Sequence, residues 1–107
     1  MLQHEAKRIS SLASTHGVSI IPHTWGSGIA LHVATHFIAN LECIPGRLIT
    51  PDFLMEYDQT ENAIRDQLTS GIKMEKGYIK VPNGPGLGFE INTTALKKMT
   101  IVQEQFT

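Results

Sequence analysis

Hydrophobic and polar positions along the 107-residue chain follow helical and strand periods in turn. Glu5–His16 carries small or apolar side chains at three-to-four spacing, which predicts an amphipathic helix, and Gly17 is placed to end it. The β-branched run Val18–Ile21 predicts a short buried strand. Pro22 ends that strand, because proline has no N–H to donate to a ladder. Ile29–Leu41 is largely apolar, which predicts a second helix packed on a sheet.

The middle of the chain continues this alternation. A loop containing Pro45, Gly46 and Pro51 leads to Phe53–Tyr57, whose apolar side chains predict a second strand. Asn62–Leu68 then predicts a short helix. The order helix, strand, helix, strand, helix is typical of an α/β fold with a parallel sheet.

The last third has a different pattern. The stretch GIKMEKGYIKVP, residues 71–82, alternates around Lys76 and Gly77, which predicts a β-hairpin with a glycine-containing turn. The stretch NGPGLGFEI predicts a rigid loop. It is not a dinucleotide-binding motif, because its glycine spacing is wrong and no helix opens directly after it. Asn92, with Thr93 or Thr94, can cap a final short helix that reaches Met99.

Composition and charge exclude several classes of protein. Nine Lys and Arg against ten Asp and Glu give a net charge of −1, so neither nucleic acid nor a membrane surface is an expected partner. Every apolar run is too short to span a bilayer, and the first residues do not resemble a signal peptide. The lone Cys43 cannot form an internal disulfide, which favours a spare thiol and a cytoplasmic location.

Two polar residues stand where the predicted strands end. His23 comes just after the first strand, and Glu56 lies near the end of the second. Ligands of parallel α/β sheets bind at the carboxyl ends of the strands, and neighbouring strands lie about 4.8 Å apart. If the two strands are neighbours, we expect His23 and Glu56 to face one pocket.

Each candidate residue also has a simpler interpretation. His23 fits a strand-end histidine bonded to backbone, and Glu56 fits a solubility charge on an edge strand. For Trp25, a packing role and a ligand contact are equally supported. His32 and His36 lie four apart on the predicted second helix, a spacing that can hold a metal. No third ligand stands at useful spacing, so packing is favoured for this pair.

The motifs together resemble a known family. EAKRISSLASTHGVSIIPHTWGSGIALHVATHFIANL, then LMEYD, ENAIRDQL and GYIKVPNGPGLGFEI, are similar to the C-terminal portion of mandelate racemase and muconate lactonising enzymes, in the enolase superfamily. The resemblance implies an α/β fold class in which residues 1–70 are the last βα units of a (β/α)7β barrel. Residues 71–107 would be a hairpin segment returning to the capping domain. The barrel would be incomplete.

The resemblance also implies roles for single residues. His23 matches a histidine that acts as general base or acid at the carbon next to a carboxylate, which suits imidazole near neutral pH. Glu56 matches a glutamate that donates a hydrogen bond to the substrate carboxylate as it gains enediolate character, which requires a protonated side chain. Trp25 and Thr24, in the loop that shapes the pocket, and Asp58, near its rim, are expected substrate contacts.

The phrases PHTWGSG and EYDQTENAIRDQL favour acid-sugar dehydratases over racemases and cycloisomerases. The family uses Mg²⁺, but its carboxylate ligands, its lysine base and the aspartate partner of the histidine lie on barrel strands that would precede Met1. We therefore expect this chain alone to hold no metal and to be inactive. An acid-sugar carboxylate would be the substrate of the full-length lyase or isomerase.

Two other classes of function stay open. One is a small α/β module that binds a carboxylate ligand through His23 and Trp25 without chemistry. The other is a structural half that completes a barrel with a separate N-terminal chain. Barrel strands without neighbours leave unpaired backbone edges, so we expect either self-association or a missing N-terminal portion.

Overall fold

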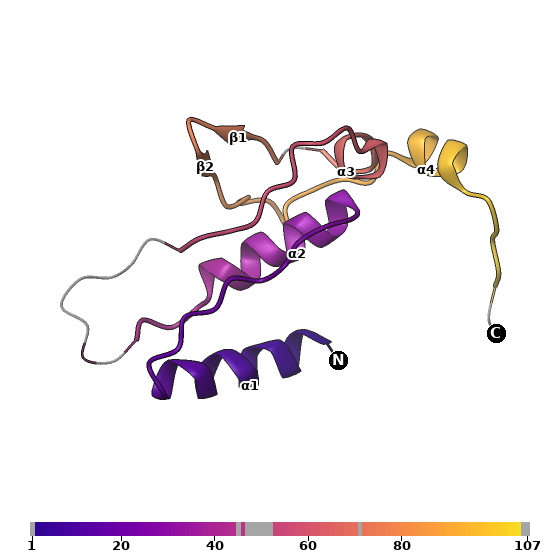
Figure 1. Ribbon diagram of the computed structural model, residues 1–107. Coiled ribbons are helices and arrows are strands. Elements are labelled where there is room, and N and C mark those ends of the chain that lie inside the picture. The colour runs from indigo at the N-terminus through magenta and orange to yellow at the C-terminus, as the bar shows by residue number, and fades with distance from the viewer. Residues whose placement is uncertain (1, 45, 47–52, 71, 106–107) are drawn as a thin grey trace.

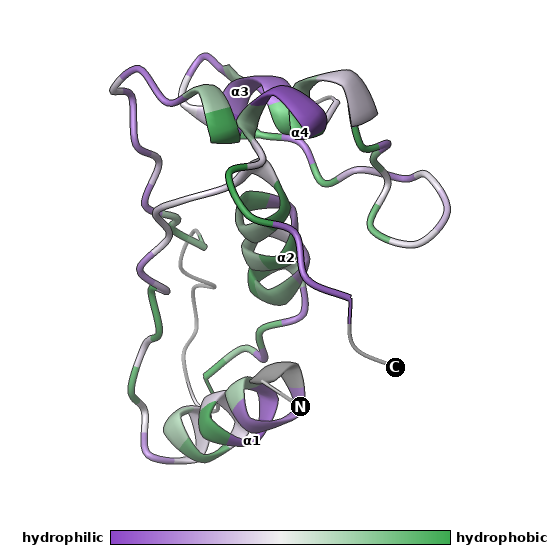
Figure 2. Ribbon diagram, turned by 90° about the vertical axis from the view of Figure 1, so that its right-hand side faces the viewer, coloured by the Kyte–Doolittle hydropathy of each residue, from purple (hydrophilic) through white to green (hydrophobic). Residues whose placement is uncertain are grey.

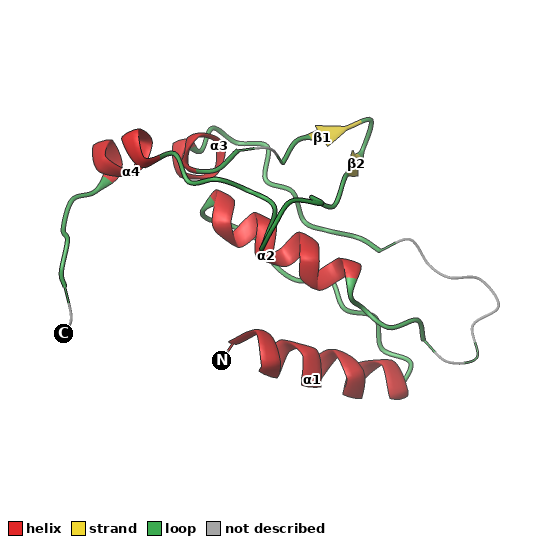
Figure 3. Ribbon diagram, turned by 180° about the vertical axis from the view of Figure 1, so that it is seen from behind, coloured by secondary structure: helices red, strands yellow, loops and turns green. Residues whose placement is uncertain are grey.

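The structure, a computed structural model, describes residues 2–44, 46, 53–70 and 72–105. In these ranges it contains helices α1 (Leu2–Thr15), α2 (Gly28–Ala39), α3 (Ala63–Leu68) and α4 (Thr93–Met99), and strands β1 (Met74–Glu75) and β2 (Tyr78–Ile79). Helix α2 lies in the middle, with α1 on one side and α3 on the other (Figure 1). The two strands form a hairpin that extends away from α3, and α4 follows at the far end (Figure 3).

The arrangement is open. The radius of gyration is 16.0 Å, whereas a compact domain of this length has about 13 Å. The buried hydrophobic side chains of the described residues are Leu31, Ile38, Leu68 and Ala95. Leu31 and Ile38 lie on α2, which is hydrophobic along its length (Figure 2), Leu68 lies on α3 and Ala95 on α4. Helix α2 packs on α3, and α3 packs on α4.

Helix α1 exposes the two large apolar side chains of its predicted stripe. Ile9 and Leu12 are 61% and 63% exposed, while Ser10 and Ser14 are buried. Ser14 donates a hydrogen bond from its hydroxyl to Glu42, 3.4 Å away. The helical period therefore predicted the helix correctly, but its apolar stripe has no cover among the described residues.

Helices α2 and α3 approach closely at Gly28. A Cβ atom at Gly28 would lie 2.1 Å from Thr69 Oγ1 and 2.7 Å from the carbonyl oxygen of Arg65. Real Cβ atoms do not come so near to a backbone oxygen, so only glycine permits this crossing. Ser27 caps α2 by accepting a hydrogen bond from the Ala30 amide at 3.3 Å.

Two imidazoles of α2 hold the last third of the chain. The Nε2 atom of His32 lies 3.1 Å from the carbonyl oxygen of Ser70, and that of His36 lies 3.0 Å from the carbonyl oxygen of Leu87. The His32 side chain is fully buried, with its ring centroid 4.4 Å from that of Phe89. The two histidines therefore bind backbone, in agreement with the packing role that the sequence favours.

The C-terminal elements agree with the sequence. Met74 pairs with Ile79 in an antiparallel hairpin, whose turn residues Lys76 and Gly77 have φ angles of 51° and 82°. Positive φ at both central residues is the type I′ geometry that matches strand twist. Asn92 caps α4 by accepting a hydrogen bond from the Ala95 amide at 3.0 Å.

Two predicted strands are wrong. Neither Val18–Ile21 nor the described Phe53–Tyr57 is a strand, and Val18 and Leu54 are 55% and 58% exposed. A β-branched run supplies the side chains for a strand, but a strand also needs a neighbour to share ladder hydrogen bonds. The described part of the chain offers no such neighbour. Pro45 and Pro51, in the predicted loop, lie outside the described residues.

The contact at Gly28 predicts a clear effect of a single methyl group. Gly28→Ala should lower the free energy of unfolding by roughly 1–3 kcal/mol, because the new methyl meets a backbone oxygen that cannot rotate away. Urea denaturation measures this. Ala39→Ser adds one atom at an exposed position of the same helix and should change stability by less than about 0.5 kcal/mol. Equal losses in both variants would contradict the close approach.

The buried ring of His32 predicts a pH dependence. Burial lowers the pKa of His32 from its ordinary 6.5, so folding favours the neutral ring. Its contribution to stability is therefore present above about pH 6.5 and is lost as the pH falls through the lowered pKa. The urea midpoint should fall between about pH 7.5 and about pH 5.

His32→Gln keeps a donor toward Ser70 but cannot titrate in this range, so it should flatten that pH dependence. His16→Gln, at an exposed histidine, should leave the wild-type slope unchanged. A wild-type slope in the His32→Gln variant would show that other groups cause the effect.

Candidate active site

His23 and Glu56 come together although they lie 33 residues apart. The Nδ1 atom of His23 is 2.5 Å from Oε2 of Glu56. The side chains are 81% and 51% exposed, so solvent screens the pair and it adds little to stability. The two side chains therefore lie in contact, without the parallel strands from which a shared pocket was expected.

The contact restricts what the imidazole can do. Glu56 as a carboxylate can only accept, so Nδ1 then carries the proton and donates it to Oε2. The second nitrogen, Nε2, is left to take or give a proton. A carboxylate that fixes one ring nitrogen is the usual way to prepare a histidine for proton transfer.

The loop that carries His23 leads directly into α2. Thr24 is half-buried, and its hydroxyl donates to the carbonyl oxygen of Pro22 at 3.5 Å. Trp25 is 69% exposed. Gly26 has a φ of 128°, which favours glycine, and its carbonyl oxygen accepts a hydrogen bond from Asn62 Nδ2 at 3.0 Å.

A hollow of about 320 Å³ lies beside His23. Trp25 lines it with side chains of α1 and α2, among them Val33 and Phe37. Glu56 is not part of this lining. His23 therefore contacts Glu56 and also borders a largely apolar hollow that Glu56 does not line.

The segment after Glu56 is held by Arg65. Its guanidinium donates to the carbonyl oxygens of Asp58 and Thr60, the latter at 2.7 Å, and lies 3.1 Å from the Asp58 carboxylate. Thr60 donates to the same carboxylate through its amide and its hydroxyl. These bonds from Thr60, and then the charge of Arg65, lower the pKa of Asp58. Substrate binding by Asp58 stays a prediction.

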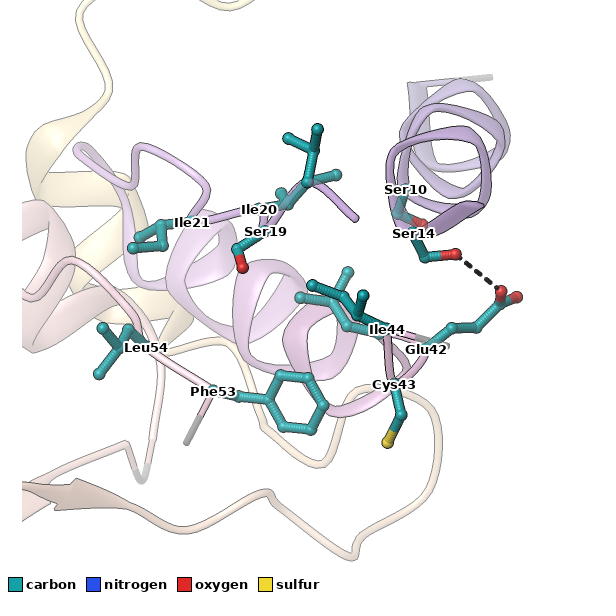
Figure 4. A pocket seen from close by; sticks show the side chains of 12 residues that line it. Ser10, Ser14, Ser19, Ile20, Ile21, Glu42, Cys43, Ile44, Phe53 and Leu54 are labelled. Atoms are coloured by element: carbon teal, nitrogen blue, oxygen red, sulfur yellow. Dashed lines mark hydrogen bonds between the residues drawn. The ribbon is translucent and has the colours of Figure 1, made fainter. Parts of the chain in front are cut away.

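A second hollow, of about 130 Å³, contains none of the predicted site residues (Figure 4). It lies between Ser10 and Ser14 of α1 on one side and Ile44, Phe53 and neighbouring apolar residues on the other. Cys43 also lines it, and two of its lining residues, Ser14 and Glu42, are joined by a hydrogen bond.

The described residues do not fit a Mg²⁺ site. Within ranges 2–44, 46, 53–70 and 72–105, no three His, Cys, Asp or Glu side chains gather closely enough to hold a metal ion. His23 and Glu56 bond to each other. The carboxylate set that the family resemblance associates with Mg²⁺ has no counterpart in the described chain.

No helix in these described ranges is both long and apolar enough to cross a membrane.

Residues 3–95 match a family model described as enolase C-terminal domain-like. The chain belongs to the enolase C-terminal domain-like family. The resemblance to the enolase superfamily is thereby confirmed. The match includes His23, Glu56 and the α2–α3 junction, so the candidate site lies inside the family region.

The chain is also similar to whole enzymes. It is 40% identical over 93 residues to the D-galactarolactone cycloisomerase of Agrobacterium fabrum, covering 86% of this chain and 25% of the relative. It is 32% identical over 88 residues to the arabinonate dehydratase of Saccharolobus solfataricus, covering 81% of this chain and 21% of the relative.

A solved structure has the same arrangement. The 3,6-anhydro-D-galactonate cycloisomerase from Zobellia galactanivorans matches with a TM-score of 0.73 and 42% identity. The match covers 90% of this chain and 25% of that enzyme. The chain thus spans about a quarter of the length of the relatives it matches.

Sequence reasoning missed the residues that hold the two parts of the site. Asn62 was predicted only as the first residue of a helix, yet it also binds the backbone at Gly26. Arg65 was assigned no role, yet it binds the backbone after Glu56. An asparagine at a helix start does signal a cap, but its second partner depends on the tertiary fold.

The contact between His23 and Glu56 predicts a defined tautomer. Imidazole nitrogen NMR should find the proton of neutral His23 on Nδ1, because the carboxylate accepts it there. Glu56→Ala should move the population toward the Nε2-protonated form. Glu61→Ala, at an exposed glutamate nearby, should leave it unchanged. A wild-type spectrum with an unprotonated Nδ1 would mean that Glu56 is the donor instead.

Proposed function

We propose that this chain is the C-terminal segment of a larger enolase-superfamily enzyme that acts on an acid sugar. The reaction would be a proton transfer at the carbon next to the substrate carboxylate. One observation carries the proposal: His23 and Glu56, the two positions that the family resemblance marks as catalytic, lie 2.5 Å apart. The acid-sugar class follows from the printed activities of the relatives.

In this proposal His23 is the general base or acid. Nε2 would take the proton from the carbon, or return one to it, while Nδ1–H stays bonded to Glu56. The electron pair of the broken C–H bond passes into the substrate carboxylate. The imidazolium formed is stabilised by the adjacent carboxylate, which keeps the ring in place for the reverse transfer.

Glu56 would act mainly through His23. The family resemblance implied a protonated glutamate that donates to the substrate, and the 2.5 Å contact favours a carboxylate that accepts from the imidazole. Thr24 and Trp25 flank His23 and would contact the substrate. The exposed indole of Trp25 offers a flat apolar surface of the kind on which a sugar ring packs.

Cycloisomerisation is the favoured reaction, with dehydration second. The sequence motifs alone favoured a dehydratase. The identities of 40% and 42% to two cycloisomerases exceed the 32% to the arabinonate dehydratase, so the comparisons favour the former. Both reactions begin with the same proton transfer, and His23 would serve either.

The remaining part of the enzyme would come from other residues of the larger protein. Members of the enolase superfamily generally use Mg²⁺, and the described residues do not fit a site for it. Apolar residues at the two positions where the sequence predicted strands, among them Ile21 and Leu54, are more than half exposed and would meet barrel neighbours in the larger protein. Residues 1–70 would belong to the barrel and residues 71–107 to the capping region, and the isolated chain would be inactive.

A chimera tests the proposal. Residues 3–95 would replace the matching segment of the Zobellia galactanivorans cycloisomerase. Exchange of the proton next to the carboxylate would be followed by NMR in heavy water, with 3,6-anhydro-D-galactonate, D-galactarolactone and arabinonate as substrates. We expect exchange with at least one of them. His23→Asn should reduce the rate by about a hundredfold or more.

His16→Asn is the matched control, because it removes an exposed histidine at the end of α1 and should leave the exchange rate unchanged. Sedimentation of the isolated chain measures whether its exposed apolar side chains bind a second copy. A His23→Asn chimera as active as its parent would overturn the assignment of the general base.

A further inference from the structure

We propose that the first turn of α3 positions the two halves of the candidate site. Asn62 holds the loop that carries His23, and Arg65 holds the segment that carries Glu56. The catalytic importance of this inference rests on the proposed function. Its test, however, measures the contact between the two side chains directly.

Asn62 uses both ends of its side-chain amide. Oδ1 accepts a hydrogen bond from the Arg65 amide at 3.1 Å and so caps α3. Nδ2 donates to the carbonyl oxygen of Gly26 at 3.0 Å, three residues after His23. An aspartate would cap the helix equally well, but an ionised aspartate has no donor for the Gly26 carbonyl, whereas the amide of Asn62 has one.

Arg65 binds the other segment. It lies one turn further along α3, and its guanidinium donates to the carbonyl oxygens of Asp58 and Thr60. It also lies over the ring of Tyr57, 5.8 Å from the centroid. The Arg65 side chain is 10% exposed, which limits the positions that its guanidinium can take. Residues 57–60 are therefore fixed immediately after Glu56.

Little else in the described chain holds His23 to Glu56. The two side chains are largely exposed, and their segments share no ladder hydrogen bonds among the described residues. Asn62 caps α3 and Arg65 lies within it, so the two residues tie both segments to the same short helix. Close packing of α3 on Gly28 joins this body to α2, which continues directly from the His23 loop.

The test separates capping from positioning. In the full chain, Asn62→Asp keeps the cap oxygen but loses the donor to Gly26. We expect α3 amides to keep their hydrogen-exchange protection. Imidazole nitrogen NMR should meanwhile show that His23 loses most of its Nδ1-protonated population. Asn62→Asp with a wild-type His23 spectrum would overturn the proposal.

Asn92→Asp is the matched control. Asn92 caps α4 with the same geometry, at 3.0 Å from the Ala95 amide, and should leave the His23 spectrum unchanged. An equal loss in this variant would show a general loss of stability instead and would overturn the proposal.

Arg65→Lys keeps the positive charge but loses the planar set of N–H donors of the guanidinium, so it should also lower the Nδ1-protonated population of His23. An unchanged signal would remove Arg65 from the proposal.

The same variants in the chimera give a second measurement. A misplaced histidine should lower kcat for proton exchange by roughly tenfold to a hundredfold, with little change in KM. Asn62→Asp should do this, and Asn92→Asp should not. If the parent chimera shows no exchange, the proposed function fails while the NMR result still decides the positioning role.

Discussion

The contact of α2 with α3 at Gly28 is the constraint on which the site depends. The two helices touch so closely that a single methyl group would collide with the backbone of α3. Both segments of the candidate site begin or end at this junction. The His23 loop runs into the first turn of α2, and the Glu56 segment runs into the first turn of α3. The packing of these helices therefore brings the ends of the two segments near each other.

Asn62 and Arg65 bind the loops that precede the two helices. Helix packing fixes the axes of α2 and α3, but it does not by itself fix the loops that precede them. Hydrogen bonds from Asn62 to Gly26, and from Arg65 to Asp58, reach back to those loops. Both donors are directional, so each loop is held at a defined position. An exposed histidine and an exposed glutamate can then meet without burial.

The open shape fits a segment of a larger fold. Apolar side chains such as Leu12, Ile21 and Leu54 are more than half exposed, which is costly for an independent domain. The chain spans about a quarter of the relatives it matches, and in them the remaining residues occupy the rest of the fold. The core around α2 is thus locally complete, while the sides that would face a barrel are uncovered.

The sequence by itself determined the helices, the hairpin and the cap of α4, because these depend on residues near one another along the chain. Asn92 before α4 and the Lys76–Gly77 turn are examples. The family motifs also marked His23 and Glu56. Only the tertiary structure decided that Val18–Ile21 is not a strand, since a ladder needs a partner, and that Asn62 reaches Gly26. Such pairings join residues distant in sequence, and no local pattern encodes them.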